Sequence, residues 1–163
     1  MRYAQIREMD VSNGEGVGVS LFVQGCPIHC KNCFNKETWD FNGGKEWTQE
    51  IENKFLELVN RDYIQRVSIL GGEPLAEQNV ETVQHILSII PNDKQKWLYT
   101  GYQFEKLNVK QMRAVALANY LVDGNYVDEL RDMRLQFRGS SNQRIIDISK
   151  TVYPEIKDVV LKN

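Results

Sequence analysis

The sequence predicts an α/β protein, an open partial (β/α) barrel with a mostly parallel sheet of about five or six strands. Short β-rich apolar runs alternate with helical patterns in units of roughly 25–45 residues, which favours parallel strands joined by right-handed crossovers. A polar or glycine-rich cluster directly follows each expected strand. With 163 residues the chain is shorter than the roughly 250 residues of a closed eight-stranded barrel, so we expect the sheet to stay open on one side.

Length and composition indicate a single domain over residues 1–163. Hydrophobic residues make up 42% of the chain, which is enough for an ordinary core. The net charge of −2 gives no reason to expect a nucleic-acid partner, and no apolar run approaches the ~20 residues of a membrane span. Unpaired cysteines without an apolar N-terminal signal segment lead us to expect a reducing, cytoplasmic environment.

The first expected strand comprises residues 17–23, VGVSLFV, and ends at Gln24-Gly25 just before the cysteines. Thr48 is expected to cap the following helix, because apolar residues recur behind it at helical spacing. These residues are Ile51, Phe55, Leu58 and Val59.

The middle of the chain predicts two more strands with a helix between them. Residues 66–70, RVSIL, form a short buried strand that leads into Gly71-Gly72-Glu73-Pro74. Asn79 is expected to cap a second helix that stops at Pro91. Its apolar face comprises Val80, Val83, Ile86, Leu87 and Ile90. Residues 96–100, KWLYT, form the third strand, which ends in Gly101-Tyr102.

The last part of the chain repeats the pattern. Asn108 and Gln111 resemble a capping box that opens a third helix. Residues 120–122 form a fourth strand before Asp123-Gly124, and residues 135–137 a fifth before Arg138-Gly139-Ser140-Ser141-Asn142. Because the carboxyl ends of parallel strands share one edge of a sheet, these clusters and the cysteine loop should converge on one site.

The chain has three cysteines, Cys26, Cys30 and Cys33, within eight residues in a C-x3-C-x2-C pattern. A structural zinc site closes its shell with four ligands, and an iron–sulfur cube normally takes four thiolates. Three thiolates therefore indicate a metal centre with one open position. The alternative is a closed zinc knuckle with His29 as fourth ligand, which would make the chain a zinc- or cluster-binding interaction module. The odd count disfavours a disulfide framework.

A set of motifs in a fixed order carries a family resemblance. They are Asn13-Gly14-Glu15-Gly16, Leu21-Phe22-Val23-Gln24-Gly25-Cys26, Cys33-Phe34-Asn35 with Thr38-Trp39, Gly71-Gly72-Glu73-Pro74, Tyr99-Thr100-Gly101-Tyr102, Val122-Asp123-Gly124 and residues 137–144, FRGSSNQR. From about residue 3 to about residue 147 the chain resembles the activating proteins of anaerobic ribonucleoside-triphosphate reductases, within the radical S-adenosylmethionine (SAM) superfamily. Many relatives have glycine at position 32; Asn32 is the residue type that best tolerates positive φ after glycine.

The resemblance implies a [4Fe–4S] cluster held by Cys26, Cys30 and Cys33, with SAM on the open iron. Reductive cleavage of SAM would give methionine and a 5′-deoxyadenosyl radical. In this family that radical removes a hydrogen atom from a glycine Cα of the reductase, and the product is a glycyl radical. The chain would accordingly be a radical SAM oxidoreductase that activates another protein.

The resemblance also implies the residues that contact SAM. Gly71 and Gly72 would let the backbone approach the ligand, and Glu73 would offer its carboxylate to the SAM ammonium. Asn32 and Phe34 flank Cys33, in the segment that contacts adenine in the superfamily. Three residues at later strand ends would contact ribose, carboxylate or a cation; each could instead cap a helix or close a turn. They are Thr100, Asp123 and Ser140.

The anaerobic reductase is the expected protein partner, and a reduced flavodoxin-type electron donor and a homodimer are family-level expectations. The enzymatic alternative is an activase of a different glycyl-radical enzyme, of the pyruvate formate-lyase type, although such activators are usually longer and lack the RGSSNQ ending. Residues 149–163 extend beyond the family pattern. Their apolar positions, Val152, Ile156, Val159 and Val160, fit an extra amphipathic segment.

Overall fold

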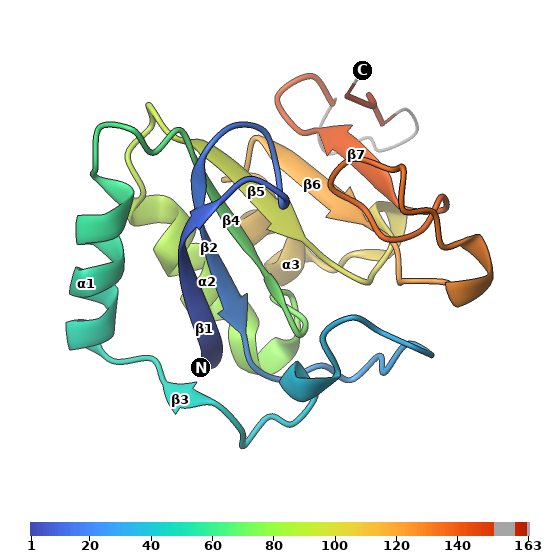
Figure 1. Ribbon diagram of the computed structural model, residues 1–163, viewed down its shortest axis with the longest axis horizontal. Helices are drawn as coiled ribbons and strands as arrows, with labels where there is room; N and C mark the ends of the chain where they lie inside the picture. The colour runs from blue at the N-terminus through green and yellow to red at the C-terminus, as the bar shows by residue number, and fades with distance from the viewer. Residues whose placement is uncertain (152–158, 163) are drawn as a thin grey trace.

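The computed structural model describes residues 1–151 and 159–162, and within them one seven-stranded sheet runs in the order β3-β1-β2-β4-β5-β6-β7 (Figure 1). The strands are β1 (Arg2–Asp10), β2 (Gly18–Val23), β3 (Lys45–Glu46), β4 (Arg66–Gly71), β5 (Gln95–Tyr99), β6 (Tyr120–Asp123) and β7 (Arg144–Asp147). The helices are α1 (Gln49–Val59), α2 (Glu77–Ile89) and α3 (Val109–Val115). The α/β class is confirmed, whereas the expected five or six strands are too few.

The sheet is parallel only in its middle. Strands β2, β4, β5 and β6 pair in parallel, while β1 is antiparallel to both β2 and β3, and β7 is antiparallel to β6. The parallel strands follow one another in chain order, so right-handed crossovers put their helices on a single face. Accordingly, α2 and α3 lie behind the sheet in Figure 1. The sheet does not close on itself.

Successive side chains along the parallel strands point to opposite faces of the sheet, and the two faces differ in composition. On the helix side, fully buried apolar residues form the core with α1, α2 and α3. The strand contributions are Val19, Leu21, Val23, Val67, Ile69, Leu98 and Leu121. The intervening positions face the side of the sheet opposite to α1, α2 and α3. They include the buried Ser20, Arg66, Ser68 and Trp97, so a polar interior lies there.

A buried arginine organises the amino-terminal end of that uncovered face. The guanidinium of Arg66 donates to the carbonyls of Asp10, Asn13 and Glu15, which fixes the loop between β1 and β2 over the sheet. Burial opposes ionisation of Asp10, but hydrogen bonds from Ser20, Asn13 and Ser12 lower its pKa to about 2. The loop closes this end of the uncovered face and leaves the carboxyl ends of the strands free.

Two of the three expected helix caps are confirmed. The Thr48 side chain accepts from the Ile51 amide at 3.2 Å, and Asn108 and Gln111 form a reciprocal capping box. The Asn79 cap is wrong, because α2 begins at Glu77 after Ala76. Asn79 is buried instead, and its amide donates to the carbonyls of Gln24 and Glu73, so it ties α2 to the loops that follow β2 and β4. No helix in the described part of the chain has the length and apolarity to cross a membrane.

The expected strand at residues 135–137 is wrong. Phe137 has a φ of 62°, which an extended strand does not adopt, and the last strand of the sheet is β7 instead. Residues 160–162 lie beside β7, where the Asp147 amide donates to Val160 and the Lys162 amide to Ile145. Part of the C-terminal extension therefore packs on the sheet. Val152 and Ile156 lie outside the described residues.

Candidate active site

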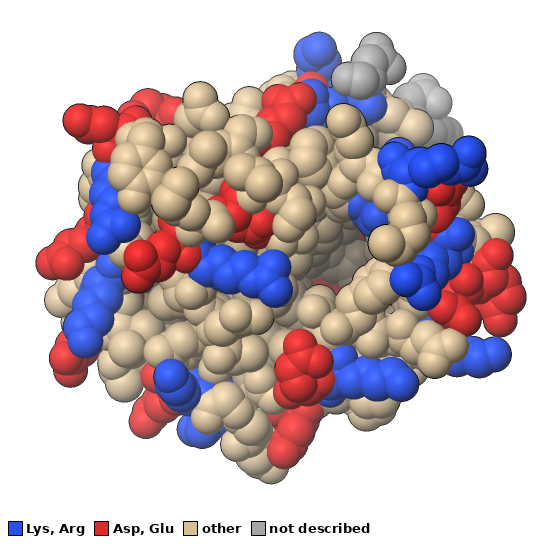
Figure 2. Space-filling view, in the orientation of Figure 1, with Lys and Arg blue, Asp and Glu red and all other residues tan. Residues whose placement is uncertain are grey.

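A cavity of about 480 Å³ opens at the carboxyl ends of the parallel strands, on the face without helices. Figure 2 shows the surface hollowed right of centre. Its wall combines the cysteine loop, residues 71–73, residues 99–101, residues 124–126 and residues 137–139. The expected convergence of segments more than a hundred residues apart is thus confirmed, and the volume suits a small-molecule ligand.

The cysteine loop leaves β2 through Gly25, whose φ of +100° is open to glycine and strained for other residues. The Gly25 amide donates to the Thr38 carbonyl at 2.6 Å, and the Cys26 amide donates to Trp39 at 3.1 Å. These bonds join the two ends of the loop. Asn32 has a φ of 54°, so the expectation that asparagine takes a positive φ here is confirmed.

All three thiols are free and line the cavity. Burial raises the pKa of Cys26 and Cys30, although backbone N–H groups that point at these sulfurs oppose the shift. The Cys33 sulfur accepts from the Asn35 amide at 3.4 Å. Hydrogen bonds to sulfur are a usual feature of iron–sulfur sites, and coordination to a metal deprotonates a thiol. Three free thiols on one cavity are the donor type that an iron–sulfur cluster takes, with each thiolate on a different iron. Among the described residues, no three His, Cys, Asp or Glu side chains converge on a single metal-ion position.

Residues between and after the cysteines pack on their neighbours. The His29 ring stacks on Trp39 with ring centroids 4.4 Å apart. The Asn32 amide donates to the Asp128 carboxylate at 2.9 Å. Phe34 packs against Tyr126, with ring centroids 4.9 Å apart. The cysteine loop is thereby held against residues 126–128.

Glu73 is the buried acid of the cavity. Its carboxylate accepts from the Gly101 amide at 2.6 Å, the Leu75 amide at 2.8 Å and the Thr100 hydroxyl at 2.9 Å. Burial raises the pKa of Glu73 to about 7, and these hydrogen bonds limit the rise. Two predicted residues, Glu73 and Thr100, are therefore directly bonded. Three hydrogen bonds leave one of the about four lone-pair sites of this carboxylate without a donor among the described residues.

Gly71 and Gly72 allow close packing of backbone on backbone. A Cβ on Gly72 would lie 2.4 Å from the Gly25 carbonyl oxygen and 2.8 Å from that of Thr38. Gly71 has a φ of +111°, and its Cβ would lie 2.7 Å from the Val23 amide nitrogen. The two glycines thus let the turn after β4 touch both ends of the cysteine loop.

Comparison with known proteins agrees with this site. Residues 12–146 match the family model described as a 4Fe-4S single cluster domain, which supports an iron–sulfur cluster. The chain is similar to anaerobic ribonucleoside-triphosphate reductase-activating proteins over most of their length. The protein of that name from Salmonella typhi is 44% identical, and the alignment covers 88% of this chain and 96% of that protein. The one from Escherichia coli K12 is 42% identical, and the alignment covers 88% of this chain and 96% of that protein. The protein of that name from phage T4 is 35% identical, over 89% of this chain and 93% of its own length.

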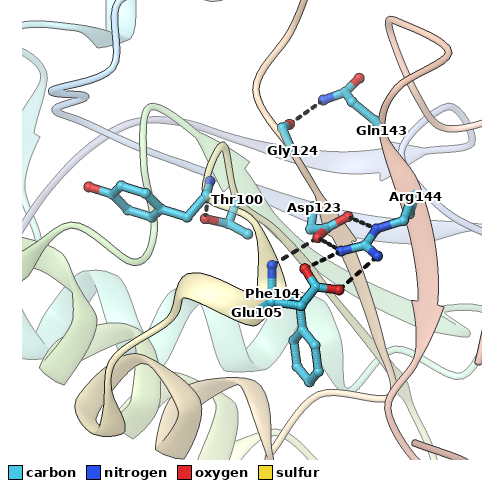
Figure 3. Close-up of polar contacts among 8 residues, drawn as sticks. Thr100, Phe104, Glu105, Asp123, Gly124, Gln143 and Arg144 are labelled. Carbon is cyan, nitrogen blue, oxygen red and sulfur yellow. Dashed lines mark hydrogen bonds and ion pairs between the residues drawn. The ribbon is translucent and has the colours of Figure 1, made fainter. Parts of the chain in front are cut away.

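The chain belongs to the family of anaerobic ribonucleoside-triphosphate reductase-activating proteins. The motifs of the activating-protein family are not all at the cavity wall. Asp123 does not line the cavity: its carboxylate accepts from the Phe104 amide and pairs with Arg144, which also binds Glu105 (Figure 3). These two carboxylates raise the pKa of Arg144. Ser140 is fully buried, and its hydroxyl accepts from the Val127 amide at 3.2 Å.

Several residues that line the cavity of this activating protein were not predicted from the sequence. Asn125 and Tyr126 line the cavity beside Cys30, and their polar groups oppose the rise in the pKa of Cys30 that burial causes. They follow Val122-Asp123-Gly124 directly, so the rule about strand ends could have found them. Arg138 belongs to a quoted motif but received no role. Trp39, which also lines the cavity, stacks on His29.

Proposed function

We propose that this protein activates an anaerobic ribonucleoside-triphosphate reductase by forming a glycyl radical on it, through reductive cleavage of SAM at a [4Fe–4S] cluster. The observation that carries the proposal is the position of three free thiols on one cavity beside a buried carboxylate. The names of the relatives supply the partner. On this proposal the protein is a radical SAM oxidoreductase with a single domain, and a reducing cytoplasm would keep its thiols free.

Cys26, Cys30 and Cys33 would hold the cluster. When bound, the cluster supplies the electron that splits SAM into methionine and a 5′-deoxyadenosyl radical. The N–H groups directed at the sulfurs would stabilise the negative charge of the thiolates. The hydrogen bonds from Gly25 and Cys26 to residues 38 and 39 would keep the three sulfurs in a fixed arrangement.

The other predicted residues would bind and orient SAM. Glu73 would accept a hydrogen bond from the amino group of SAM, and Thr100 would keep the Glu73 carboxylate in place. Gly71 and Gly72 would place that carboxylate beside the cysteine loop. Phe34, which lines the cavity beside Tyr126, is proposed to contact adenine. Asn32 does not line the cavity and bonds Asp128, so its proposed contact with adenine would require the loop to turn toward the ligand.

Asp123 and Ser140 are proposed to act through their neighbours. Asp123 fixes the end of β6 through Phe104 and Arg144 (Figure 3). Ser140 supports the segment after Tyr126. Both would set the position of the wall at residues 124–126, whose polar groups oppose the rise in the pKa of Cys30.

A 5′-deoxyadenosyl radical must meet its target before it is quenched, so the target glycine would enter the cavity on a loop of the reductase. The radical takes a hydrogen atom from the glycine Cα, which yields 5′-deoxyadenosine and leaves the radical on glycine. The uncovered face of the sheet provides the access (Figure 2). A reduced flavodoxin-type donor and a homodimer remain proposals from the family resemblance.

Electron paramagnetic resonance tests the proposal. The protein is reconstituted anaerobically with iron and sulfide, and then mixed with SAM, a reductant and the anaerobic reductase from the same source. We expect a glycyl-radical doublet that requires SAM and disappears without the reductase. A reducible cluster and SAM turnover without a doublet would contradict the assigned partner, and a colourless protein that takes up zinc would contradict the chemistry.

The pKa of Glu73 predicts that the free energy of unfolding of the apoprotein falls as pH rises from 4.5 to about 7. Below pH 4.5 the carboxyl is protonated in the folded and the unfolded chain, so its burial adds no charge penalty. Above about pH 7 it is ionised in both, and the folded state is less stable by about 3 kcal/mol. Urea unfolding under reducing conditions across this pH range measures the effect.

The matched variants for this prediction are Glu73→Gln and Glu50→Gln. The first removes the buried titrating group, and we expect it to remove this part of the pH dependence. Glu50 has an 80% exposed side chain, so its variant should follow the wild type. An unchanged slope in Glu73→Gln would show that Glu73 does not titrate in this range.

A further inference from the structure

We propose that Arg138 binds the carboxylate of SAM, an inference that rests on the proposed function. Arg138 lines the cavity on the wall formed by residues 137–139. Gly139 lies against the cysteine loop, since a Cβ there would be 2.8 Å from the Phe34 ring. Arg138 therefore borders the same cavity as the three thiols and Glu73.

The backbone before Arg138 is held in an unusual conformation. Phe137 has a φ of 62°, which a bulky side chain rarely adopts. The Tyr99 hydroxyl donates to the Phe137 carbonyl at 2.9 Å, and the Phe137 ring packs edge-on against Trp97 with ring centroids 5.3 Å apart. Strain of this kind persists where the surrounding structure enforces it, and it is concentrated at functional sites. Here it turns the chain so that Arg138 joins the cavity wall.

The backbone after Arg138 is fixed by Gln143. Its side-chain oxygen accepts from the amides of Gly139 and Ser140, at 2.9 and 3.1 Å. Its side-chain nitrogen donates to the Gly124 carbonyl at 3.0 Å (Figure 3). The segment on both sides of Arg138 is thereby preorganised and tied to the end of β6.

The guanidinium itself is left incompletely bonded. One terminal nitrogen, Nη1, donates to the Gln143 carbonyl at 3.1 Å. The Nε–H is buried and has no acceptor among the residues that the structure describes. Arg66 and Arg144, in contrast, direct their Nε–H to acceptors within the protein. A buried donor without a partner is costly, and a charged one more so, which indicates that a ligand supplies the acceptor.

The charges of SAM indicate which of its groups would accept the hydrogen bond from Arg138. SAM carries a sulfonium, an amino group and one carboxylate, and the carboxylate is its anionic group. A guanidinium presents its donors in a planar fork that suits a carboxylate. Glu73 and Arg138 would thus receive the two polar ends of the methionyl part of SAM. Arg7 also borders the cavity, but it is exposed and lies over the Phe22 ring, 4.6 Å from its centroid.

The experiment compares SAM with decarboxylated SAM, which keeps the adenosyl, sulfonium and amino groups. Equilibrium dissociation constants are measured for both ligands on the reconstituted protein without a reductant, so no turnover is involved. In Arg138→Met we expect SAM affinity to fall about ten- to hundredfold, as for loss of a charged hydrogen bond, with little change for decarboxylated SAM. Arg138→Lys keeps the charge but not the fork, so it should fall between the wild type and the methionine variant.

Arg134→Met is the matched control, because Arg134 lies in the same segment with a 91% exposed side chain. It should leave both constants unchanged. If Arg138→Met weakens both ligands equally, Arg138 is a structural residue and the inference is overturned. Unchanged SAM affinity in that variant overturns it as well. A wild type that binds neither ligand would instead overturn the proposed function, and the inference with it.

Discussion

Replacement of Cys26, Cys30 or Cys33 by alanine is expected to abolish the formation of 5′-deoxyadenosine and of the glycyl radical. The described chain has these three thiols on one cavity, and its sequence has no other cysteine to substitute for a lost one. With two thiolates, two of the four irons of the cluster would lack a protein ligand, instead of the one iron that is left open for SAM. We expect 5′-deoxyadenosine, quantified by chromatography, to drop to the level of a reaction without protein.

His29→Phe is the matched control for the cysteine variants. The His29 ring stacks on Trp39, and phenylalanine keeps an aromatic ring there while it removes the nitrogen ligands. We expect this variant to bind iron and sulfide like the wild type. Loss of metal in His29→Phe would favour the closed zinc knuckle, and full turnover in any cysteine variant would contradict the three-thiolate site.

The sequence was most informative about the cysteine loop and the residues at strand ends, where the spacing of a few neighbouring residues is enough to predict a binding site. The cysteine pattern and the residues that follow each parallel strand predicted the cavity, because a parallel sheet brings those ends together. Strand β1 was missed because its alternation is broken: Arg7 and Glu8 are adjacent and exposed. The expected strand at residues 135–137 failed for another reason. The apolar Phe137 suggested a strand, but its side chain packs on Trp97 and lines the cavity. Its positive φ is incompatible with an extended strand.

Polar residues at strand ends illustrate the same limit. Thr100 and Asp123 have equivalent positions in the sequence pattern, yet Thr100 bonds Glu73 in the cavity while Asp123 pairs with Arg144 on β7. The antiparallel addition of β7 beside β6 supplies that arginine, and this pairing was not visible in the local sequence. Asn79 likewise resembles a helix cap in the sequence, but its side chain donates hydrogen bonds to the carbonyls of Gln24 and Glu73 instead.

Gly72→Ala is expected to disrupt the site although it adds one methyl group. The new Cβ would lie 2.4 Å from the Gly25 carbonyl oxygen and 2.8 Å from that of Thr38, and both are backbone atoms. They cannot move independently, because the Gly25 amide bonds Thr38 and the Gly25 carbonyl accepts from the Glu73 amide at 2.7 Å. Overpacking of this kind costs about 1–3 kcal/mol of the free energy of unfolding, or more against rigid neighbours.

The expected functional effect of Gly72→Ala is larger than its effect on stability. Relief of the clash must separate the turn that carries Glu73 from the loop that carries the cysteines, so the acid and the thiols would no longer share one cavity wall. We expect SAM binding to be lost even when the variant is folded and contains iron. Dissociation constants for SAM, together with iron content and urea unfolding, separate the two effects.

Gly101→Ala provides the contrast, since its Cβ would also lie 2.4 Å from a neighbour, but that neighbour is the end of the flexible Ile28 side chain. A side-chain rotation can relieve this contact, whereas no rotation relieves the contact at Gly72. We therefore expect Gly101→Ala to keep most of its SAM affinity. Equal losses in the two variants would mean that any added methyl group fills space that SAM needs. A loss confined to Gly72→Ala would show that this glycine is required because two backbone segments touch there, and that their contact holds Glu73 beside the cysteines.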